Sequence, residues 1–355
     1  MSAEKTSSRA GVDPRRYFEQ AGPDLGAVAH RDPVCLYIET TNRCNLLCTT
    51  CPRTYEDMEP PADMSWEVFT RIVDQFPTVP RVVLHGIGEP MLVRSLPRMI
   101  RYLKERGTYV LFNTNGTALT QKKGQELIDA GLDELRVSLD AADRISFKEL
   151  RGRDDFERIV RHVRRFATRQ RELGLERPRL SLWLTGLKET LDQLPAFIEL
   201  AHRLGVGEVY LQRLVYFPDG QGMARPNSAL FENLTAADAG LLRAAKERAE
   251  TLGIRFDASG ATEPGTSVTK STSDQPWSLC RRPWTVMYFT AHGRALPCCI
   301  APFAVRGYEQ ITLGDATQET LRGIWYGERY RALRRALMSD RPAKSCANCG
   351  LRWSL

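Results

Sequence analysis

Six short apolar segments alternate with helix-like segments between Val34 and Val215, and this alternation constrains the fold more than any other feature. Strands and helices that alternate with short connections form a parallel sheet, and right-handed crossovers curl it. We therefore expect an α/β fold built on a partial (β/α)6 barrel of the TIM type. The predicted strands lie at 34–41, 81–86, 109–113, 134–140, 180–185 and 208–215.

Residue types at the segment ends mark several helices. Ser65 can cap a helix that runs to about Gln75, and Thr120 can cap one that Gly131 ends. A long basic helix is predicted over 155–173. In folds of this type the functional loops follow the carboxyl ends of the strands, which is where the distinctive motifs described below fall.

Changes in composition divide the chain into four predicted parts. Residues 1–30 form an N-terminal arm and 31–225 the barrel. Residues 226–276 form a helical and linker segment rich in Gly, Pro, Ser and Thr, and 277–355 form a small α+β domain.

Composition argues against several classes of partner. The longest apolar runs are shorter than 18 residues and the N-terminus has no apolar core, so we expect a cytoplasmic protein without a membrane partner. The net charge is +7, but the densest basic run lies on the predicted helix 155–173, where a solvated face explains it. Because aromatic residues do not alternate with this run, no nucleic-acid partner is expected.

Nine cysteines carry the strongest functional signal, and seven of them fall into two tight groups. An odd number without a secretory context argues against a disulfide framework and favours metal binding. The first group, Cys44, Cys48 and Cys51, forms C-x3-C-x2-C directly after the first predicted strand. Three thiolates can hold three irons of a cubane and leave the fourth iron open. Zinc remains an alternative, with His85 as a fourth ligand.

This motif after the first strand of a βα barrel resembles the radical S-adenosylmethionine (SAM) superfamily, over about residues 34–215. The resemblance implies a [4Fe–4S] cluster whose open iron binds SAM. It also implies reductive cleavage of SAM to a 5′-deoxyadenosyl radical, which abstracts hydrogen from the substrate. An electron donor such as flavodoxin or ferredoxin is implied as a partner.

Further strand ends resemble SAM-contacting motifs of that family. They are the HGIGEP segment, the NTNG segment, the end of the fourth strand and the LRGR segment. An ordinary glycine turn and a surface arginine are the alternatives for the first and the last. The cofactor-binding residues that the resemblance implies are Gly86, Gly88, Glu89, Pro90, Asn115, Ser138, Asp140 and Arg151.

The second group consists of Cys280, Cys298, Cys346 and Cys349. The pattern C-x12-G-x4-C followed by C-x2-C resembles the SPASM/twitch extension of radical SAM enzymes. Since the chain ends six residues after Cys349, we expect one auxiliary [4Fe–4S] cluster, as in twitch domains. A structural zinc site with the same four ligands is the alternative.

The spacing of this group is similar to that of twitch enzymes such as 2-deoxy-scyllo-inosamine dehydrogenase and a related aminoglycoside epimerase. This implies oxidation or epimerisation of a small sugar- or cyclitol-like substrate. Arg213, as a base or an anchor, and Cys299 are candidate catalytic residues. Cys299 is a hydrogen-atom donor, an alternative ligand or a packed thiol, and Cys35 is expected in the core.

Two other functions stay open. One is modification of a ribosomal peptide, although the arm at 1–30 is too short for the peptide-binding domain that such enzymes often carry. The other is a non-catalytic interaction protein that binds a cluster or zinc.

Overall fold

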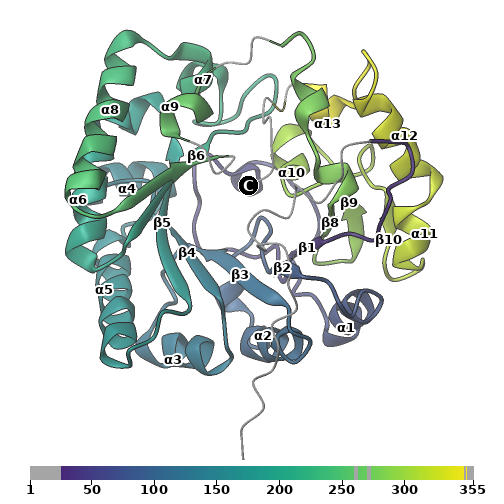
Figure 1. The fold of residues 1–355 in the computed structure, drawn as a ribbon, viewed down its shortest axis with the longest axis horizontal. Helices are drawn as coiled ribbons and strands as arrows, with labels where there is room; N and C mark the ends of the chain where they lie inside the picture. Colours follow the sequence, from purple (N-terminus) through teal and green to yellow (C-terminus); the bar gives the residue numbers. More distant parts are fainter. Residues whose placement is uncertain (1–24, 260–262, 270–272, 348, 350–355) are drawn as a thin grey trace, which may run out of the picture.

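The computed structural model describes residues 25–259, 263–269, 273–347 and 349, which form one twisted sheet of ten strands with helices around it (Figure 1). The first seven strands are parallel neighbours in chain order, so the predicted α/β fold with a partial parallel barrel is confirmed. These strands are β1 (Cys35–Ile38), β2 (Arg81–Val83), β3 (Tyr109–Thr114), β4 (Glu134–Ser138), β5 (Arg179–Gly186), β6 (Glu208–Arg213) and β7 (Arg255–Ala258).

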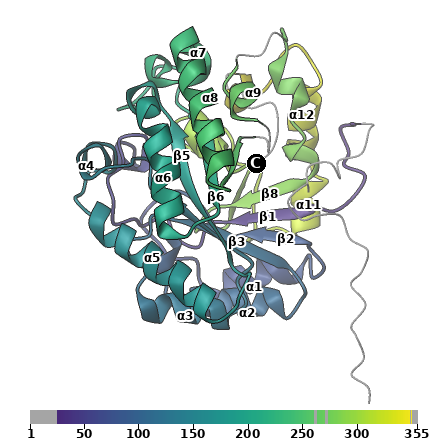
Figure 2. The same cartoon turned by 60° about the vertical axis from the view of Figure 1, so that its left-hand side comes forward.

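Helices cover the outer face of the curved sheet (Figures 1 and 2). Both predicted caps are present: Ser65 accepts a hydrogen bond from the Val68 amide (3.2 Å), and Thr120 accepts one from the Lys123 amide (3.3 Å). The helices are α1 (Trp66–Asp74), α2 (Leu96–Lys104), α3 (Gln121–Asp129), α4 (Arg144–Arg151), α5 (Phe156–Glu172), α6 (Leu194–Leu204), α7 (Leu230–Asn233), α8 (Ala236–Thr251), α9 (Pro264–Ser267), α10 (Ala301–Ala304), α11 (Leu321–Trp325), α12 (Glu328–Leu337) and α13 (Lys344–Ala347).

The C-terminal region adds three strands to the other edge of the same sheet. β8 (Val286–Phe289) lies parallel to β1, while β9 (Arg294–Leu296) and β10 (Gly314–Asp315) continue antiparallel. The sequence predicted strands here but assigned them to a separate domain beginning at 277. In the structure the backbone hydrogen bonds between β1 and β8 cross that boundary, so barrel and C-terminal region share one sheet.

The predicted arm and linker are described only in part. Residues 1–24 of the arm lie outside the described residues, as do 260–262 and 270–272 of the linker. The described part of the segment 226–276 contains α8 and β7. α8 begins with a capping box at Thr235, and β7 pairs with β6 and so extends the barrel. Within the described residues, no helix is long and apolar enough to cross a membrane.

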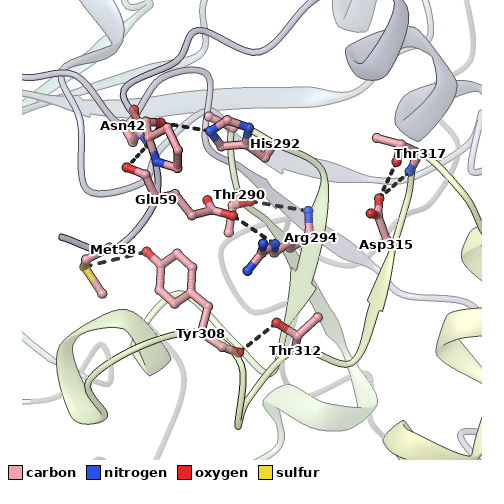
Figure 3. Close-up of polar contacts among 12 residues, drawn as sticks. Asn42, Met58, Glu59, Thr290, His292, Arg294, Tyr308, Thr312, Asp315 and Thr317 are labelled. Atoms are coloured by element: carbon pink, nitrogen blue, oxygen red, sulfur yellow. Dashed lines mark hydrogen bonds and ion pairs between the residues drawn. The ribbon is translucent and has the colours of Figure 1, made fainter.

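A loop that follows β1 packs against the β8–β9 hairpin (Figure 3). The Asn42 side chain donates a hydrogen bond to the carbonyl oxygen of Pro60 (2.9 Å), and His292 Nε2 lies 2.8 Å from the same oxygen. Glu59 forms an ion pair with Arg294 of β9 (3.2 Å). These contacts hold the C-terminal region against the segment that carries the first group of thiols.

Candidate active site

Three thiols lie together beyond the carboxyl end of β1. Cys44, Cys48 and Cys51 line one cavity, which we call the thiol cavity. The Cys51 amide and the Thr54 hydroxyl both donate to the carbonyl oxygen of Cys48 (3.1 and 2.9 Å), which folds the loop compactly. Burial, with a smaller effect of Cys48, raises the pKa of Cys51 to about 12. Metal binding would therefore have to displace its proton.

Two buried side chains donate hydrogen bonds to these thiols. Asn115 Nδ2, beyond the end of β3, lies 3.8 Å from Cys44 Sγ. Arg151 Nη1, at the end of α4, lies 3.5 Å from Cys48 Sγ. The Asn115 side-chain oxygen accepts from the Thr117 amide (3.0 Å), which fixes the orientation of its nitrogen. Both donors belong to the predicted cofactor-binding set.

Asp140 fixes the orientation of Arg151. Its carboxylate lies 2.7 Å from Arg151 Nη2 and accepts a hydrogen bond from the Thr185 amide (2.8 Å). Asp140 has a φ of +63°, a conformation that Asp tolerates better than most residues. Burial lowers the pKa of Arg151, but the charges of Asp140 and Cys48 outweigh it and raise that pKa, so the guanidinium stays charged. Ser138 lines the same cavity.

The glycines of the HGIGEP segment are required by close packing. A Cβ on Gly86 would lie 2.3 Å from the Glu39 side chain, and one on Gly88 would lie 2.2 Å from the carbonyl oxygen of Thr41. Both glycines line the thiol cavity. Any side chain here would push β2 and the thiol-bearing loop apart, so the segment is more than an ordinary turn.

Glu89 is buried and organises the neighbouring strand ends. Its carboxylate accepts hydrogen bonds from the Thr114 hydroxyl (2.7 Å) and from the amides of Asn115 (2.6 Å) and Met91 (3.0 Å). Burial raises the pKa of Glu89, and these three donors oppose that rise. Glu89 lines the thiol cavity, whereas Pro90 begins a short helical turn and is not part of the lining.

A second cavity, the inner cavity, opens from the first toward the C-terminal region. Its lining includes Arg136, Trp183 and both predicted catalytic candidates, Arg213 and Cys299. The polar residues that line both cavities come from the loop after β1 and from the ends of β2, β3, β5 and β6: Thr50, His85, Asn113, Thr185 and Gln212. The two cavities are therefore continuous at the carboxyl ends of the barrel strands.

The two catalytic candidates are buried side chains. Arg213 is 4% exposed, and its guanidinium lies 3.8 Å above the ring of Phe231. Burial raises the pKa of Cys299 to about 11, which keeps it a thiol at neutral pH. Cys35 is fully buried in the core, as predicted.

His85 is a site residue that the sequence interpretation considered only as a zinc ligand. It follows β2 and lines both cavities, and its Nδ1 has no hydrogen-bond partner among the described residues. Burial, followed by the charge of Arg136, lowers the pKa of His85 to about 4. The imidazole is therefore neutral at pH 7. Its position just before the glycines was the available signal.

The four C-terminal cysteines lie near one another without converging on one point. Burial raises the pKa of Cys346 well above its usual value, and nearby Cys298, Cys280 and Cys349 raise it further. The Cys349 amide donates to the Cys346 carbonyl oxygen (3.3 Å), closing the turn between these two. Among the described residues, no three cysteine, histidine or acidic side chains converge closely enough to bind a single metal ion.

Two family models match this chain, one in the barrel and one in the C-terminal region. Residues 38–201 match the radical SAM superfamily, and 280–350 match the SPASM family, an iron–sulfur cluster-binding domain. The chain therefore contains a radical SAM domain and, after it, a SPASM domain. Radical SAM domains bind a [4Fe–4S] cluster and SAM, and SPASM domains bind auxiliary clusters.

Several relatives of this radical SAM protein are similar over part or most of their length. The PqqA peptide cyclase of Streptomyces rochei is 27% identical over 330 residues, covering 92% of this chain and 83% of the relative. The tungsten-containing aldehyde ferredoxin oxidoreductase cofactor-modifying protein of Pyrococcus furiosus is 30% identical over 184 residues, 51% of each chain. This chain therefore spans about half the length of that relative.

A solved structure shows the same fold. Streptococcus suis SuiB bound to S-adenosylmethionine superposes with a TM-score of 0.65 at 18% identity, covering 85% of this chain and 68% of SuiB.

The thiol cavity fits the cofactors that radical SAM domains bind. It offers three cysteine thiols, two N–H donors to their sulfurs, and glycines that leave room for close approach. Cysteine thiolates are the usual ligands of [4Fe–4S] clusters, and hydrogen bonds to their sulfurs are a common feature of such sites.

Proposed function

We propose that this radical SAM enzyme modifies a peptide. The observation that carries the proposal is the similarity to the PqqA peptide cyclase, which extends over 92% of this chain and so includes barrel and SPASM region together. The small sugar- or cyclitol-like substrate expected from the twitch resemblance lacks comparable support. Oxidation or epimerisation of such a molecule is therefore the alternative that the second experiment below tests.

We assign the first cluster to Cys44, Cys48 and Cys51. When bound, this cluster and SAM supply a 5′-deoxyadenosyl radical for hydrogen abstraction. The chain orients them through the close-packed glycines and through the donors Asn115 and Arg151.

The other residues that we assign to the SAM site are those that the sequence predicted to bind this cofactor. Gly86, Gly88, Glu89, Ser138 and Asp140 line the thiol cavity, so they face or shape the SAM site. Pro90 supports this site through the backbone turn that follows Glu89.

The auxiliary cluster is assigned to Cys280, Cys298, Cys346 and Cys349. Four thiolates close the coordination of such a cluster, so its role is to transfer electrons or to stabilise the fold. The inner cavity adjoins the thiol cavity, and its lining includes Cys299, the sequence neighbour of Cys298.

The inner cavity suits a substrate that carries polar groups. Its titratable lining residues include His85, Arg136 and Arg213, and its lining contains no aspartate or glutamate. Arg136 is paired with Glu134 (2.6 Å), and the guanidinium of Arg213 is the second cation of the lining that could contact a polar or anionic group. The thiol of Cys299 would donate a hydrogen atom only if the product is an epimer.

The first experiment tests the cofactors. The protein is reconstituted anaerobically with iron and sulfide, and iron content and reductive SAM cleavage are measured. Two [4Fe–4S] clusters predict about eight irons per chain. A Cys44/Cys48/Cys51 triple alanine variant should keep about four irons and lose cleavage. Absence of cleavage in the wild-type protein with a full iron complement would refute radical SAM chemistry.

The second experiment tests the substrate class. Peptides encoded beside the gene and a panel of aminocyclitols are each prepared with deuterium on carbon. Transfer of deuterium to 5′-deoxyadenosine, with a mass change in the substrate, identifies the class that the enzyme uses. Transfer from cyclitols alone would overturn the peptide proposal.

A further inference from the structure

The residues that line both the thiol cavity and the inner cavity carry no charge at pH 7. Phe303 is apolar, and His85 is neutral because burial lowers its pKa to about 4. The others are Thr, Asn and Gln side chains. We call the polar residues that line both cavities the junction ring; they are Thr50, His85, Asn113, Thr185 and Gln212.

The sheet directs much of the junction ring toward the inner cavity. Asn113, Thr185 and Gln212 are half-buried, and the residue before each of them is fully buried. Thr185 lies opposite Gln212 in the β5–β6 ladder. Because side chains alternate along a strand, these two share a face with Trp183 and Tyr210, whose rings stack 3.9 Å apart. The ring therefore lies one step along the strands from an aromatic pair.

The hydrogen-bonding capacity of the junction ring is unused within the protein. In the part of the chain that the structure describes, none of its five side chains forms a hydrogen bond with another protein group. The buried Nδ1 of His85 is one of these atoms. A carboxamide, a hydroxyl and a neutral imidazole each offer both a donor and an acceptor. Buried polar groups normally have partners, so the ring can bind a ligand that offers both.

The charged groups that line the inner cavity are cations. Arg136 and Arg213 belong to the described lining, which contains no aspartate or glutamate. Glu134 offsets the charge of Arg136 (2.6 Å), but it is shared with Arg179 (2.9 Å) and does not line the cavity. An ammonium group in this cavity would lie beside guanidinium groups without a carboxylate to pair with, which is costly.

The carboxylates on the other side of the junction are already engaged. Asp140 pairs with Arg151 (2.7 Å), and Glu89 accepts hydrogen bonds from the Thr114 hydroxyl (2.7 Å) and from two backbone amides. Both carboxylates line the thiol cavity and neither lines the inner cavity. They therefore do not offset the cations of the inner cavity.

An amide group fits this environment. It is neutral, and it presents a donor and an acceptor in one plane, which the carboxamides of Asn113 and Gln212 can match. Since SAM is assigned to the thiol cavity and the substrate to the inner cavity, hydrogen passes between them at the junction.

We propose that the junction ring binds an uncharged amide of the substrate, next to the carbon that loses hydrogen, and that ammonium groups are rejected there. This inference rests on the proposed function, in which the amide belongs to a peptide. It adds which chemical group of the substrate the chain recognises beside the reacting carbon.

The test measures the binding of paired probes to the reconstituted full-length protein, with SAM present and without a reductant. N-acetylalanine N-methylamide, a neutral diamide, is compared with alanine N-methylamide, a cation. Di-N-acetyl-2-deoxystreptamine is compared with 2-deoxystreptamine, its cationic parent. myo-Inositol offers hydroxyl groups alone. Saturation-transfer NMR gives the dissociation constants.

Each neutral amide should bind at least about tenfold more tightly than its amine partner. Equally tight binding of the amines or of myo-inositol would overturn the proposal, and so would no detectable binding of either amide. Binding of the acetylated cyclitol without the alanine diamide would support the amide site and count against a peptide as its source. Deuterium transfer from a peptide, without any preference for amide probes, would overturn this inference alone and leave the proposed function standing.

Variants test whether the junction ring makes the contact. Gln212→Leu and Asn113→Leu each remove a carboxamide, and Gln121→Leu makes the same change at the exposed first residue of α3. Each ring variant should bind the alanine diamide about two- to tenfold more weakly, as expected for one lost neutral hydrogen-bond partner, and the control should not. Iron content shows whether each variant keeps its fold. Wild-type binding in both ring variants, with iron retained, would place the amide elsewhere and overturn the proposal.

Discussion

One methyl group added at Gly88 should disrupt the first cluster site. The Cβ of a Gly88→Ala variant would lie 2.2 Å from the carbonyl oxygen of Thr41 and 2.7 Å from that of Arg43. Both obstacles are backbone atoms of the segment that leads into Cys44, so neither can swing aside as the end of a side chain would. The strain must be relieved by moving the thiol-bearing loop away from the β2 end.

The expected cost follows from the number of contacts. Overpacking a filled site costs about 1–3 kcal/mol, and two backbone clashes place this variant near the upper end, at about 2–3 kcal/mol. A displaced loop should also fail to hold its cluster. We therefore expect about four irons per chain instead of about eight, and no SAM cleavage.

The assay combines iron analysis, SAM cleavage and denaturant unfolding. Gly207→Ala is the matched control, because a Cβ there meets nothing within 4 Å; it should change stability by less than about 0.5 kcal/mol. Full iron content and wild-type cleavage in Gly88→Ala would refute the argument that close packing at Gly88 positions the loop.

Three further variants test separate parts of the structure. The folded protein keeps His85 neutral down to a pKa of about 4, while the unfolded chain protonates it near pH 6.5, so acidification favours unfolding. Lowering the pH from 6.5 to 5.5 should therefore reduce the free energy of unfolding of the wild type by about 1 kcal/mol more than that of His85→Gln. Denaturant titrations at the two pH values measure this difference. Asn115→Leu removes the donor to Cys44 and should lower the reduction potential of the first cluster in an EPR-monitored titration, with iron retained. Thr235→Ala removes the cap of α8 and should cost about 1 kcal/mol in denaturant unfolding without changing the iron content.

The barrel could be predicted from the sequence because its signals are local. Each strand is a short apolar run, and Ser65 and Thr120 are caps that act within one turn of their helices. The pairing of β8 with β1 could not be predicted in this way. The two strands are far apart in the chain, and an apolar run shows that a strand is buried without showing which strand it joins.

The same distinction between local and long-range features applies to the candidate site. Cysteine spacing predicted which thiols would group together, because three of them lie on one short loop. Asp140 pairs with Arg151 from a backbone conformation with positive φ, and no sequence pattern marks that conformation or that pair. His85 was underestimated because its importance comes from the junction of two cavities, which exists only in the folded chain.

The shared sheet has a consequence for the two cluster sites. β1 is hydrogen-bonded to β2 on one side and to β8 on the other, and the loop with the first thiols leaves from its end. Beyond that end, the Glu39 carboxylate accepts hydrogen bonds from the Ile87 amide on the β2 side (2.8 Å) and from the Ala291 amide on the β8 side (3.0 Å). A separate domain on a linker could change its distance from the barrel, whereas a strand paired with β1 cannot do so without breaking this ladder. The sheet, rather than the linker before 277, therefore sets the separation between the two groups of thiols.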